Sequence, residues 1–220
     1  MARRHQQRNY GGFIPSDQLP LTKTQMGAVL EYTGGESLWL NKYLDRWAQI
    51  DGGRESVEAQ LTKTQQNKLK RLVQLVSAAI KKSPPSRKSV VVYKGIEDVP
   101  DEWLRVPVGR LLPHTVRGLV STSFDKNMAK TFMSPNAEDQ SVLLTLALPK
   151  KTRGLFVQSV SQFEDENELI LPHGSRFRVT RRTFVVYRGR RCVNYICRLS
   201  SQPKEIARIA PPGKFVTTTT

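Results

Sequence analysis

The sequence predicts an α+β domain in which N-terminal helices pack on a core of antiparallel β-sheets. Two observations carry this prediction. Apolar residues recur at helical spacing from Leu21 to about Lys82, and short β-branched segments separated by turn residues follow. A chain of 220 residues is long enough to form one such domain around its own core. We expect the domain to span residues 18–202, between a basic flexible arm (1–17) and a C-terminal tail (203–220).

Three helices are expected in the first part of the chain. The first covers residues 21–35 and should stop at Gly34 and Gly35, because glycine readily adopts the left-handed conformation that ends many helices. The second covers residues 36–47, and the third runs from about Val57 to Lys82. The third has one apolar face, comprising Leu69, Leu72, Val73, Val76, Ala79 and Ile80. Its other face is basic, which is typical of a solvated surface but also suits a polyanion (Lys63, Lys68, Lys70, Arg71, Lys81 and Lys82).

Short strands are expected from residue 89 onward, each bounded by glycine, proline or other turn residues. A single short helix should interrupt them at residues 125–133, with Asp125 as its N-cap. The predicted strands are SVVVYKGI (89–96), GLVSTSF (118–124), SVLLTLALP (141–149), RGLFVQSV (153–160), ENELILP (166–172), RFRVTRR (176–182), TFVVYRG (183–189) and VNYICRL (193–199).

Cysteine and histidine usage argues against a disulfide framework or a metal centre. Cys192 and Cys197 lie five residues apart in a predicted strand, so their side chains should point to opposite faces and not form a bridge. A reducing compartment fits this pattern. The three histidines and two cysteines show no zinc-type spacing, so we expect no metal.

The location expected from the sequence is intracellular, in the cytoplasm of the producing or infected cell. No apolar run approaches the roughly 20 residues that cross a bilayer. The basic N-terminus is not followed by the apolar segment of a signal peptide. Export by a route that needs no signal peptide is the alternative.

The balance of charge first suggests a nucleic-acid binder. The chain has 35 Lys and Arg against 19 Asp and Glu, a net charge of +16. Eleven basic residues and one acidic residue lie between Arg176 and Lys214. The aromatic residues among them follow strand spacing, so we expect them in the core rather than stacked on bases (Phe177, Phe184, Tyr187 and Tyr195).

Three segments contain residues suited to chemistry. In FEDENE (163–168), Glu166 and Glu168 project from one face of an extended segment, an arrangement used for acid–base catalysis or for stabilising a cation. The alternative is a solvated acidic turn. In VVVYKG, Lys94 ends an apolar strand, where it suits a phosphate or, alternatively, protects an exposed sheet edge.

The third segment is GLVSTSF, in which hydroxyl groups alternate with apolar side chains. Strand alternation places Leu119, Ser121 and Ser123 on one face, and the residues between them on the other. A hydroxyl on a buried face needs a hydrogen-bond partner, and a carboxylate would serve. The alternative is an ordinary strand end.

In this order, the three segments resemble the ADP-ribosyltransferases of the Arg–Ser–Glu class, which includes bacterial-toxin, phage and vertebrate arginine-modifying members. The resemblance runs over residues 25–199, and AVLEYTGGESLWLNKYLDR looks like the helical lead-in of the toxin-like members. The remaining matches are the family's STS motif, its E-x-E motif and the aromatic residue that precedes the latter (Ser121, Thr122 and Ser123; Glu166 and Glu168; Phe163).

One family motif departs from the pattern. The family ends its first strand with an arginine that contacts NAD, and Lys94 occupies that position here, between Tyr93 and Gly95. Lysine meets a phosphate as a point charge but lacks the planar fork of arginine. The lysine leaves three alternatives open: NAD binds more weakly, another arginine contacts the phosphates, or activity is lost. The resemblance implies a cofactor-binding set of Tyr93, Lys94, Gly95, Ser121, Thr122 and Ser123.

The resemblance implies cleavage of NAD+ at the nicotinamide–ribose bond and transfer of ADP-ribose to a protein side chain, arginine in particular. Glu168 would stabilise the oxocarbenium-like transition state, and Ser121 would hold Glu168. Glu166 would orient and deprotonate the acceptor, while Phe163 would contact the protein substrate. The expected acceptor is an acidic or nucleic-acid-associated host protein. The alternatives are an NAD glycohydrolase and a non-enzymatic basic module that binds nucleic acid or ribosomes.

Overall fold

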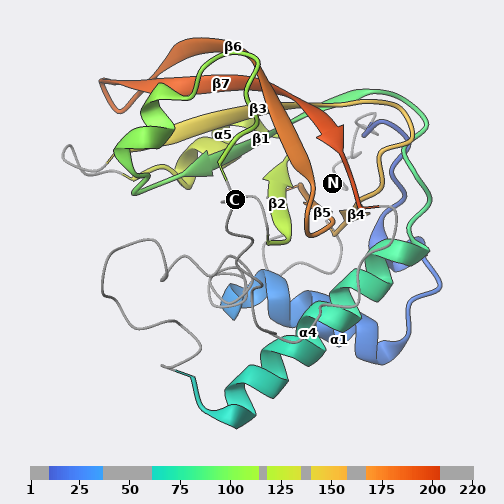
Figure 1. Cartoon of the computed structure of the whole chain (residues 1–220). Coiled ribbons are helices and arrows are strands. Elements are labelled where there is room, and N and C mark those ends of the chain that lie inside the picture. Colours follow the sequence, from blue (N-terminus) through green and yellow to red (C-terminus); the bar gives the residue numbers. More distant parts are fainter. Residues whose placement is uncertain (1–9, 37–60, 114–117, 135–139, 158–166, 204–220) are drawn as a thin grey trace, which may run out of the picture.

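Seven strands form one sheet, and helices lie against it (Figure 1). The structure, a computed structural model, describes residues 10–36, 61–113, 118–134, 140–157 and 167–203. The strand order is β4-β5-β2-β1-β3-β7-β6. Neighbouring strands are antiparallel except for β3 and β7, which run parallel. The predicted α+β class, with helices first and strands after, is confirmed, although the sheet is not antiparallel throughout.

The two long helices begin at the same five-residue sequence, LTKTQ. In α1 (Lys23–Glu31) and α4 (Lys63–Lys82), a threonine N-cap accepts a hydrogen bond from the backbone N–H of a glutamine three residues later. The glutamine side chain accepts one in return from the N–H of the N-cap. This reciprocal capping box satisfies backbone donors that the first helical turn leaves open. It starts α4 at Lys63, which corrects the predicted start at Val57.

The C-terminal end of α1 also differs from the prediction. The helix passes into a π-helical turn, η2 (Tyr32–Glu36), instead of stopping at Gly34. This wider turn carries Tyr32, whose side chain is fully buried. The second predicted helix covers residues 36–47, and all of it from residue 37 onward lies outside the described residues.

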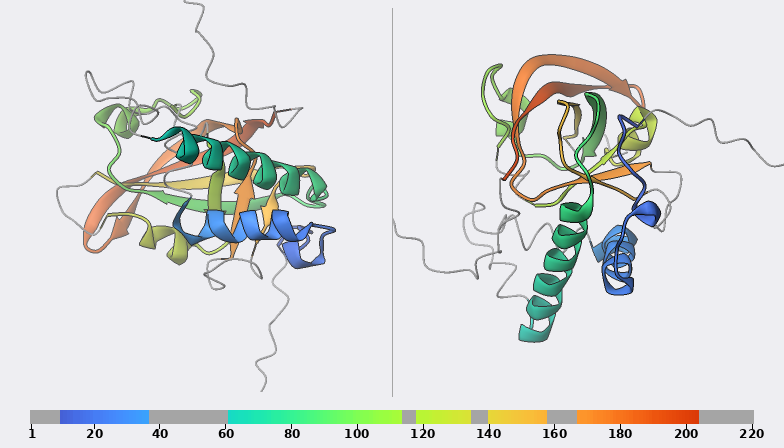
Figure 2. Two further views of the ribbon diagram at one scale, coloured as in Figure 1. Left: turned by 90° about the horizontal axis from the view of Figure 1, so that it is seen from below. Right: turned by 90° about the vertical axis from the view of Figure 1, so that its right-hand side faces the viewer.

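The amphipathic pattern of α4 is confirmed. Its predicted apolar face is buried against α1 and against one end of the sheet, where β4, β5 and Leu119 just before β2 contribute to the same cluster (Figures 1 and 2). Each fully buried aliphatic side chain of this kind stabilises the fold by about 1.5–3 kcal/mol. The basic residues of the opposite face are exposed, except for the half-buried Lys70. Among the described helices, none is long and apolar enough to span a membrane.

The strands follow the predicted segments with one exception. RFRVTRR and TFVVYRG form a single strand, β6 (Arg176–Tyr187), because an irregularity between Val179 and Arg181 absorbs the change of register. The others are β1 (Val90–Ile96), β2 (Val120–Ser123), β3 (Val142–Leu148), β4 (Leu155–Phe156), β5 (Glu168–Leu171) and β7 (Arg190–Ser201). The short helix α5 (Lys126–Thr131) is capped by Asp125, as predicted.

Residues 10–17, which the sequence assigned to a flexible arm, pack against the sheet. Phe13 is buried in the main core, and the carbonyl of Gly11 accepts hydrogen bonds from the N–H groups of Arg87 and Lys88. Gly11 has φ +70°, and a Cβ there would meet Val90 Cγ1 at 2.0 Å, so the approach requires glycine. The limits of the domain itself stay a prediction.

Strand β7 confirms the predicted orientation of the two cysteines. Cys192 and Cys197 are free and buried in separate apolar clusters on opposite faces of the sheet. Burial raises the pKa of the Cys197 thiol to about 12, so it stays protonated at neutral pH. Of the aromatic residues expected in the core here, Phe177 and Tyr195 are buried. Phe184 is not, with 46% of its surface exposed.

Candidate active site

Predicted site residues lie on three neighbouring strands, β1, β2 and β5. Ser123 of β2 pairs in register with Tyr93 of β1 on one side and with Glu168 of β5 on the other. Residues that are directly opposite in antiparallel strands share a face of the sheet, so these three side chains project to the same side. Ser121, two residues earlier, shares that side and pairs with Ile170. The fold therefore brings the two serines and the glutamate together.

Glu168 is the first residue of β5 and is only 7% exposed. Its Oε2 atom has no access to solvent. The strand is fixed at this point because the Glu168 carbonyl accepts a hydrogen bond from the Val157 N–H at 3.0 Å. A carboxylate in such a setting is costly to bury and is typical of a site rather than of a surface turn. The solvated-turn interpretation is therefore wrong for Glu168.

The residue before Glu168 is held by two distant parts of the chain. Asn167 has a φ of 46°, in the left-handed region, which asparagine tolerates better than most residues. Its carbonyl accepts a hydrogen bond from Phe124 N–H at 3.2 Å, and its Oδ1 accepts one from Tyr10 Oη at 2.9 Å. The Tyr10 ring also packs on the rings of Phe124 and Phe156. The N-terminal segment thus buttresses the start of β5.

Ser121 is held by the helical layer. Its Oγ lies 2.8 Å from the hydroxyl of Tyr32, and the same hydroxyl lies 3.5 Å from the carbonyl of Leu119. The resemblance had implied that Ser121 holds Glu168. The hydroxyl of Ser121 is hydrogen-bonded to Tyr32, and the residue directly opposite Glu168 is Ser123, so the role of Ser121 toward Glu168 stays a prediction.

The other two hydroxyls of the STS motif support the local backbone. Thr122 Oγ1 donates to the carbonyl of Leu169 at 2.8 Å, on the opposite face of the sheet. Ser123 Oγ accepts a hydrogen bond from Asp125 N–H at 2.9 Å and so joins β2 to the cap of α5. These contacts fix the relative positions of β2, β5 and α5 around the glutamate.

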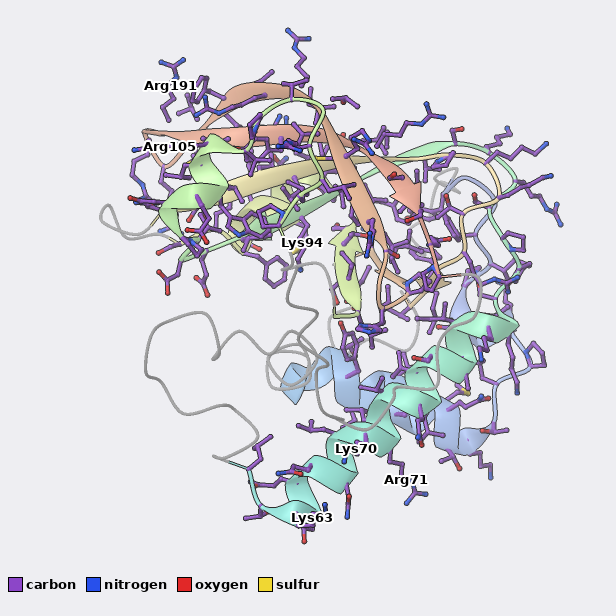
Figure 3. The ribbon with its side chains drawn as sticks, viewed as in Figure 1. Lys63, Lys70, Arg71, Lys94, Arg105 and Arg191 are labelled. Carbon is purple, nitrogen blue, oxygen red and sulfur yellow. The ribbon has the colours of Figure 1, made fainter. Side chains whose placement is uncertain are left out.

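Lys94 follows Tyr93 in β1 (Figure 3), so strand alternation directs its side chain to the face opposite Tyr93, Ser123 and Glu168, and its contact with this group is to the backbone of β2. Its Nζ donates to the carbonyl of Ser121 at 3.2 Å. The alternative role, protection of an exposed sheet edge, is wrong because β1 lies in the interior of the sheet between β2 and β3. The next residue must be glycine, since a Cβ on Gly95 would lie 2.0 Å from the carbonyl oxygen of Ala129 in α5.

Phe163 and Glu166 lie outside the described residues, so their roles stay predictions. Tyr10 and Tyr32 are residues that the sequence alone did not single out. Their contacts join positions 157 and 89 residues apart, respectively, and no local pattern reports such a contact. Within the described ranges, no group of three or more His, Cys, Asp or Glu side chains is arranged to hold a metal ion.

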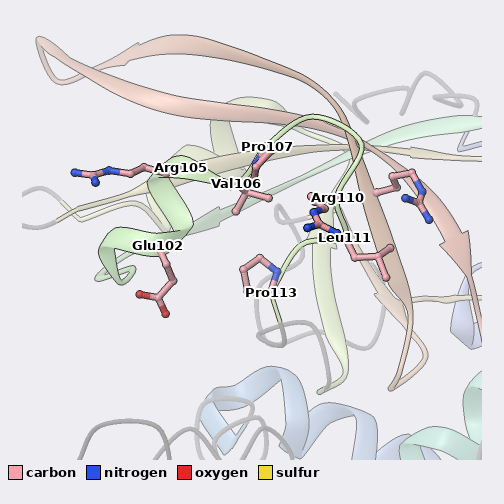
Figure 4. Close-up of a pocket in the computed structure, with 8 residues that line it drawn as sticks. Glu102, Arg105, Val106, Pro107, Arg110, Leu111 and Pro113 are labelled. Atoms are coloured by element: carbon pink, nitrogen blue, oxygen red, sulfur yellow. The ribbon is translucent and has the colours of Figure 1, made fainter.

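A pocket of about 500 Å³ lies elsewhere, beside the 3-10 helix η4 (Asp101–Arg105). It contains none of the predicted site residues. Figure 4 shows Glu102 and Arg105 extending apart from η4, with Arg110 and Pro113 on the segment that follows. Arg178 of β6 completes the lining, and its guanidinium donates to the carbonyl of Gly109.

Comparison with known proteins supports the resemblance seen in the sequence. Residues 113–196 match the family model described as ADP-ribosyltransferase exoenzyme, and this stretch includes both the STS and the E-x-E motif. No curated protein matches the chain.

Solved structures of ADP-ribosyltransferase toxins share the fold. Plx2a from Paenibacillus larvae is 21% identical, with a TM-score of 0.60 over 82% of this chain and 88% of its own. Vis from Vibrio splendidus, in complex with agmatine, is 15% identical, with a TM-score of 0.62 over 84% and 79%. Exoenzyme S from Pseudomonas aeruginosa, bound to human 14-3-3 protein beta and carba-NAD, is 18% identical, with a TM-score of 0.58 over 82% and 75%.

The chain therefore shares the fold of the ADP-ribosyltransferase toxins. Within that class, the chain resembles the exoenzyme toxins in both sequence and structure. These findings support NAD+-dependent transfer of ADP-ribose.

Proposed function

We propose that the protein is a mono-ADP-ribosyltransferase that cleaves NAD+ at the nicotinamide–ribose bond and transfers ADP-ribose to a protein side chain, arginine in particular. The observation that carries the proposal is the register between β2 and β5, which sets the STS segment beside the buried Glu168. Support also comes from the match of residues 113–196 to the exoenzyme family.

The proposed reaction breaks the bond between ribose C1′ and the nicotinamide nitrogen, and the bonding electron pair leaves with nicotinamide. Positive charge develops on the ribose, as in glycoside hydrolysis. The Glu168 carboxylate stabilises this charge through a hydrogen bond to a ribose hydroxyl. A preorganised group of this kind typically contributes about 10²–10³ in rate.

In the second half of the reaction, an acceptor nitrogen attacks C1′ and loses a proton. Glu166 accepts that proton and orients the acceptor, while Phe163 contacts the protein that carries it. Arginine as the acceptor is favoured by the two glutamates of the E-x-E motif, which are separated by one residue. It is also favoured by the likeness to Vis, whose structure contains agmatine, a guanidine compound.

Binding of NAD+ involves the first strand and the STS motif. Lys94 supplies positive charge for the phosphates, beside Tyr93, Gly95 and the Ser121–Ser123 segment. The hydrogen bond from Lys94 Nζ to the Ser121 carbonyl supports this role, because it keeps the ammonium group next to that segment. The likeness to exoenzyme S, whose structure contains carba-NAD, agrees with NAD+ as the substrate.

The proposed acceptor is an acidic or nucleic-acid-associated protein inside the cell. Labelled NAD+ tests this directly, with agmatine or a host lysate as acceptor and with nicotinamide release measured in parallel. We expect labelled agmatine and at least one labelled protein band from the wild type. Glu166→Gln should lose transfer while keeping part of the nicotinamide release.

Each other outcome has a definite meaning. Nicotinamide release without transfer to agmatine or protein would identify an NAD glycohydrolase, in which water is the acceptor. Equal loss of release and transfer in Glu166→Gln would contradict the role given to Glu166. Absence of both activities in the wild type would contradict the enzyme and leave a non-enzymatic module on the same fold.

A further inference from the structure

The hairpin of β6 and β7 contains half of the net positive charge of the protein. Residues 176–201 include eight arginines and no Lys, Asp or Glu, in a chain whose net charge is +16. Seven of the eight are exposed, and Arg190 is half-buried. The exposed members are Arg176, Arg178, Arg181, Arg182, Arg188, Arg191 and Arg198.

Two of these arginines gather around an exposed aromatic ring. The register pairs Phe184 with Val193, Val186 with Arg191 and Arg182 with Tyr195, so these six side chains share one face of the hairpin. The Arg191 guanidinium lies 3.7 Å from the centroid of the Phe184 ring, and that of Arg182 lies 5.3 Å away. Both distances are within the range of cation–π contacts.

Packing in the hydrophobic core does not explain why Phe184 and its neighbours lie on this face. Phe184 is 46% exposed and Val186 is 67% exposed, although apolar strand residues usually find a buried face. Strand β6 is the last strand of the sheet, and the hairpin forms one border of the molecule (Figures 1 and 2). Within the residues that the structure describes, neither Arg182 nor Arg191 forms an ion pair.

The same surface continues into the pocket beside η4. The Tyr195 hydroxyl donates to the carbonyl of Trp103 and accepts from the N–H of Val106, which places η4 next to the residue paired with Arg182. Three exposed arginines line that pocket, one of which is Arg178 of the hairpin, and Glu102 is the acidic residue there. We define the arginine face as Arg105, Arg110, Arg182 and Arg191, together with the Phe184 ring; Arg178 pairs with Arg198 and projects from the other face of the hairpin.

We propose that the arginine face binds single-stranded nucleic acid. Guanidinium groups bind phosphates in a bidentate manner and stack on flat rings, and the face contains arginine with no lysine. An exposed aromatic ring beside them offers a stacking surface for a base, a combination common in proteins that bind single strands. An acidic protein surface would be matched equally well by lysine, so the composition favours the nucleic acid.

This binding is separate from the proposed transfer reaction, because the arginine face contains none of the residues assigned to NAD+ or to the acceptor. The experiment measures fluorescence anisotropy of short labelled RNA and DNA single strands with the full chain, at salt concentrations from about 50 to 200 mM. The site variant is Arg182→Gln with Arg191→Gln. A second variant, Phe184→Ala, removes the ring without changing the charge. RNA and DNA strands are both tested because they carry the same phosphates, which the arginines would contact in either.

The matched control is Lys63→Gln with Arg71→Gln, which removes the same charge from the exposed face of α4 (Figure 3). We expect the logarithm of the binding constant to fall linearly with the logarithm of salt concentration, with a slope near −0.7 per phosphate contact. The site variant should lose about 1.4 units of that slope and at least about tenfold in affinity, whereas the control should change affinity less than about threefold. Phe184→Ala should lose about fivefold or more.

Three results would overturn the proposal. Equal losses in the site and control variants would mean that binding follows net charge alone. Competition by polyglutamate as effective as that by unlabelled oligonucleotide would assign the face to an acidic protein. Absence of binding to RNA and DNA at the lowest salt would remove the ligand altogether. Transfer of ADP-ribose to agmatine should stay unchanged in the site variant, so failure here is distinguishable from failure of the proposed activity.

Discussion

Tyr32 illustrates how single residues far from the recognised motifs support the site. Its ring is completely buried at the end of α1, and its hydroxyl lies 2.8 Å from Ser121 Oγ. The hydroxyl thus fixes one rotamer of a serine that shares a sheet face with Glu168. We regard Tyr32 as a positioning residue.

Removing this hydroxyl tests that role. Tyr32→Phe should lower the kcat of nicotinamide release about three- to tenfold with little change in the NAD+ KM, because a typical hydrogen bond contributes about 0.5–1.5 kcal/mol. Tyr195→Phe is the matched control, since Tyr195 is equally buried and its hydroxyl makes two hydrogen bonds away from the site. Steady-state kinetics with both variants decide the matter. An equal fall of kcat in the two would reduce Tyr32 to a structural role.

Lys94 is the residue proposed to meet the phosphates of NAD+, and its charge is testable by itself. Lys94→Ala should raise the NAD+ KM by about tenfold or more, because a hydrogen bond to a charged group contributes about 1.5–3 kcal/mol. Lys94→Arg should keep the KM or lower it, since arginine restores the planar fork. The measurement is initial rate against NAD+ concentration. An unchanged KM in both variants would remove Lys94 from the binding site.

At the scale of elements, the sequence predicted most of the fold because the relevant signals are local. The apolar face of α4, the cap of α5 and six of the eight strand segments depend on spacing within a few residues. The STS segment and Glu168 were found for the same reason. The continuous strand β6 was missed because its irregularity beyond Val179 interrupts the alternation on which the prediction depended.

What the sequence could not supply are contacts between distant segments. The Tyr10 and Tyr32 hydrogen bonds each join the N-terminal part of the chain to a motif strand, and the sequence contains no pattern that pairs them. The exposure of Phe184 was missed for a related reason. Alternation identifies the two faces of β6, but only the arrangement of neighbouring elements shows which part of a face is exposed to solvent.

The two LTKTQ caps give a prediction at this scale. Thr22→Ala and Thr62→Ala each remove one capping box and should each lower the free energy of unfolding by about 1 kcal/mol, or about 2–4 °C in Tm. Only Thr22→Ala should also lower activity, because α1 leads directly into the turn that carries Tyr32. Thermal unfolding and nicotinamide release, measured on both variants, test this. Equal activity in the two would contradict the link between α1 and the site.

For the whole molecule, the net charge of +16 has two separate meanings. The proposed catalysis centres on Glu168. This glutamate is buried on the side of the sheet that the helices cover. The largest concentration of positive charge lies instead on the β6–β7 hairpin, at the opposite end of the strand order from β4 and β5. The positive charge of the hairpin therefore concerns the binding partners of the protein, whereas the proposed chemistry depends on the buried carboxylate of Glu168.

The central claim is that Glu168 stabilises the cleavage of NAD+, and nicotinamide release by Glu168→Gln tests it most directly. The change keeps the size of the side chain and removes its charge, so circular dichroism and Tm should confirm an intact fold. We predict that the rate of nicotinamide release falls at least about 10²-fold relative to wild type. A folded Glu168→Gln variant that releases nicotinamide at the wild-type rate would contradict the account.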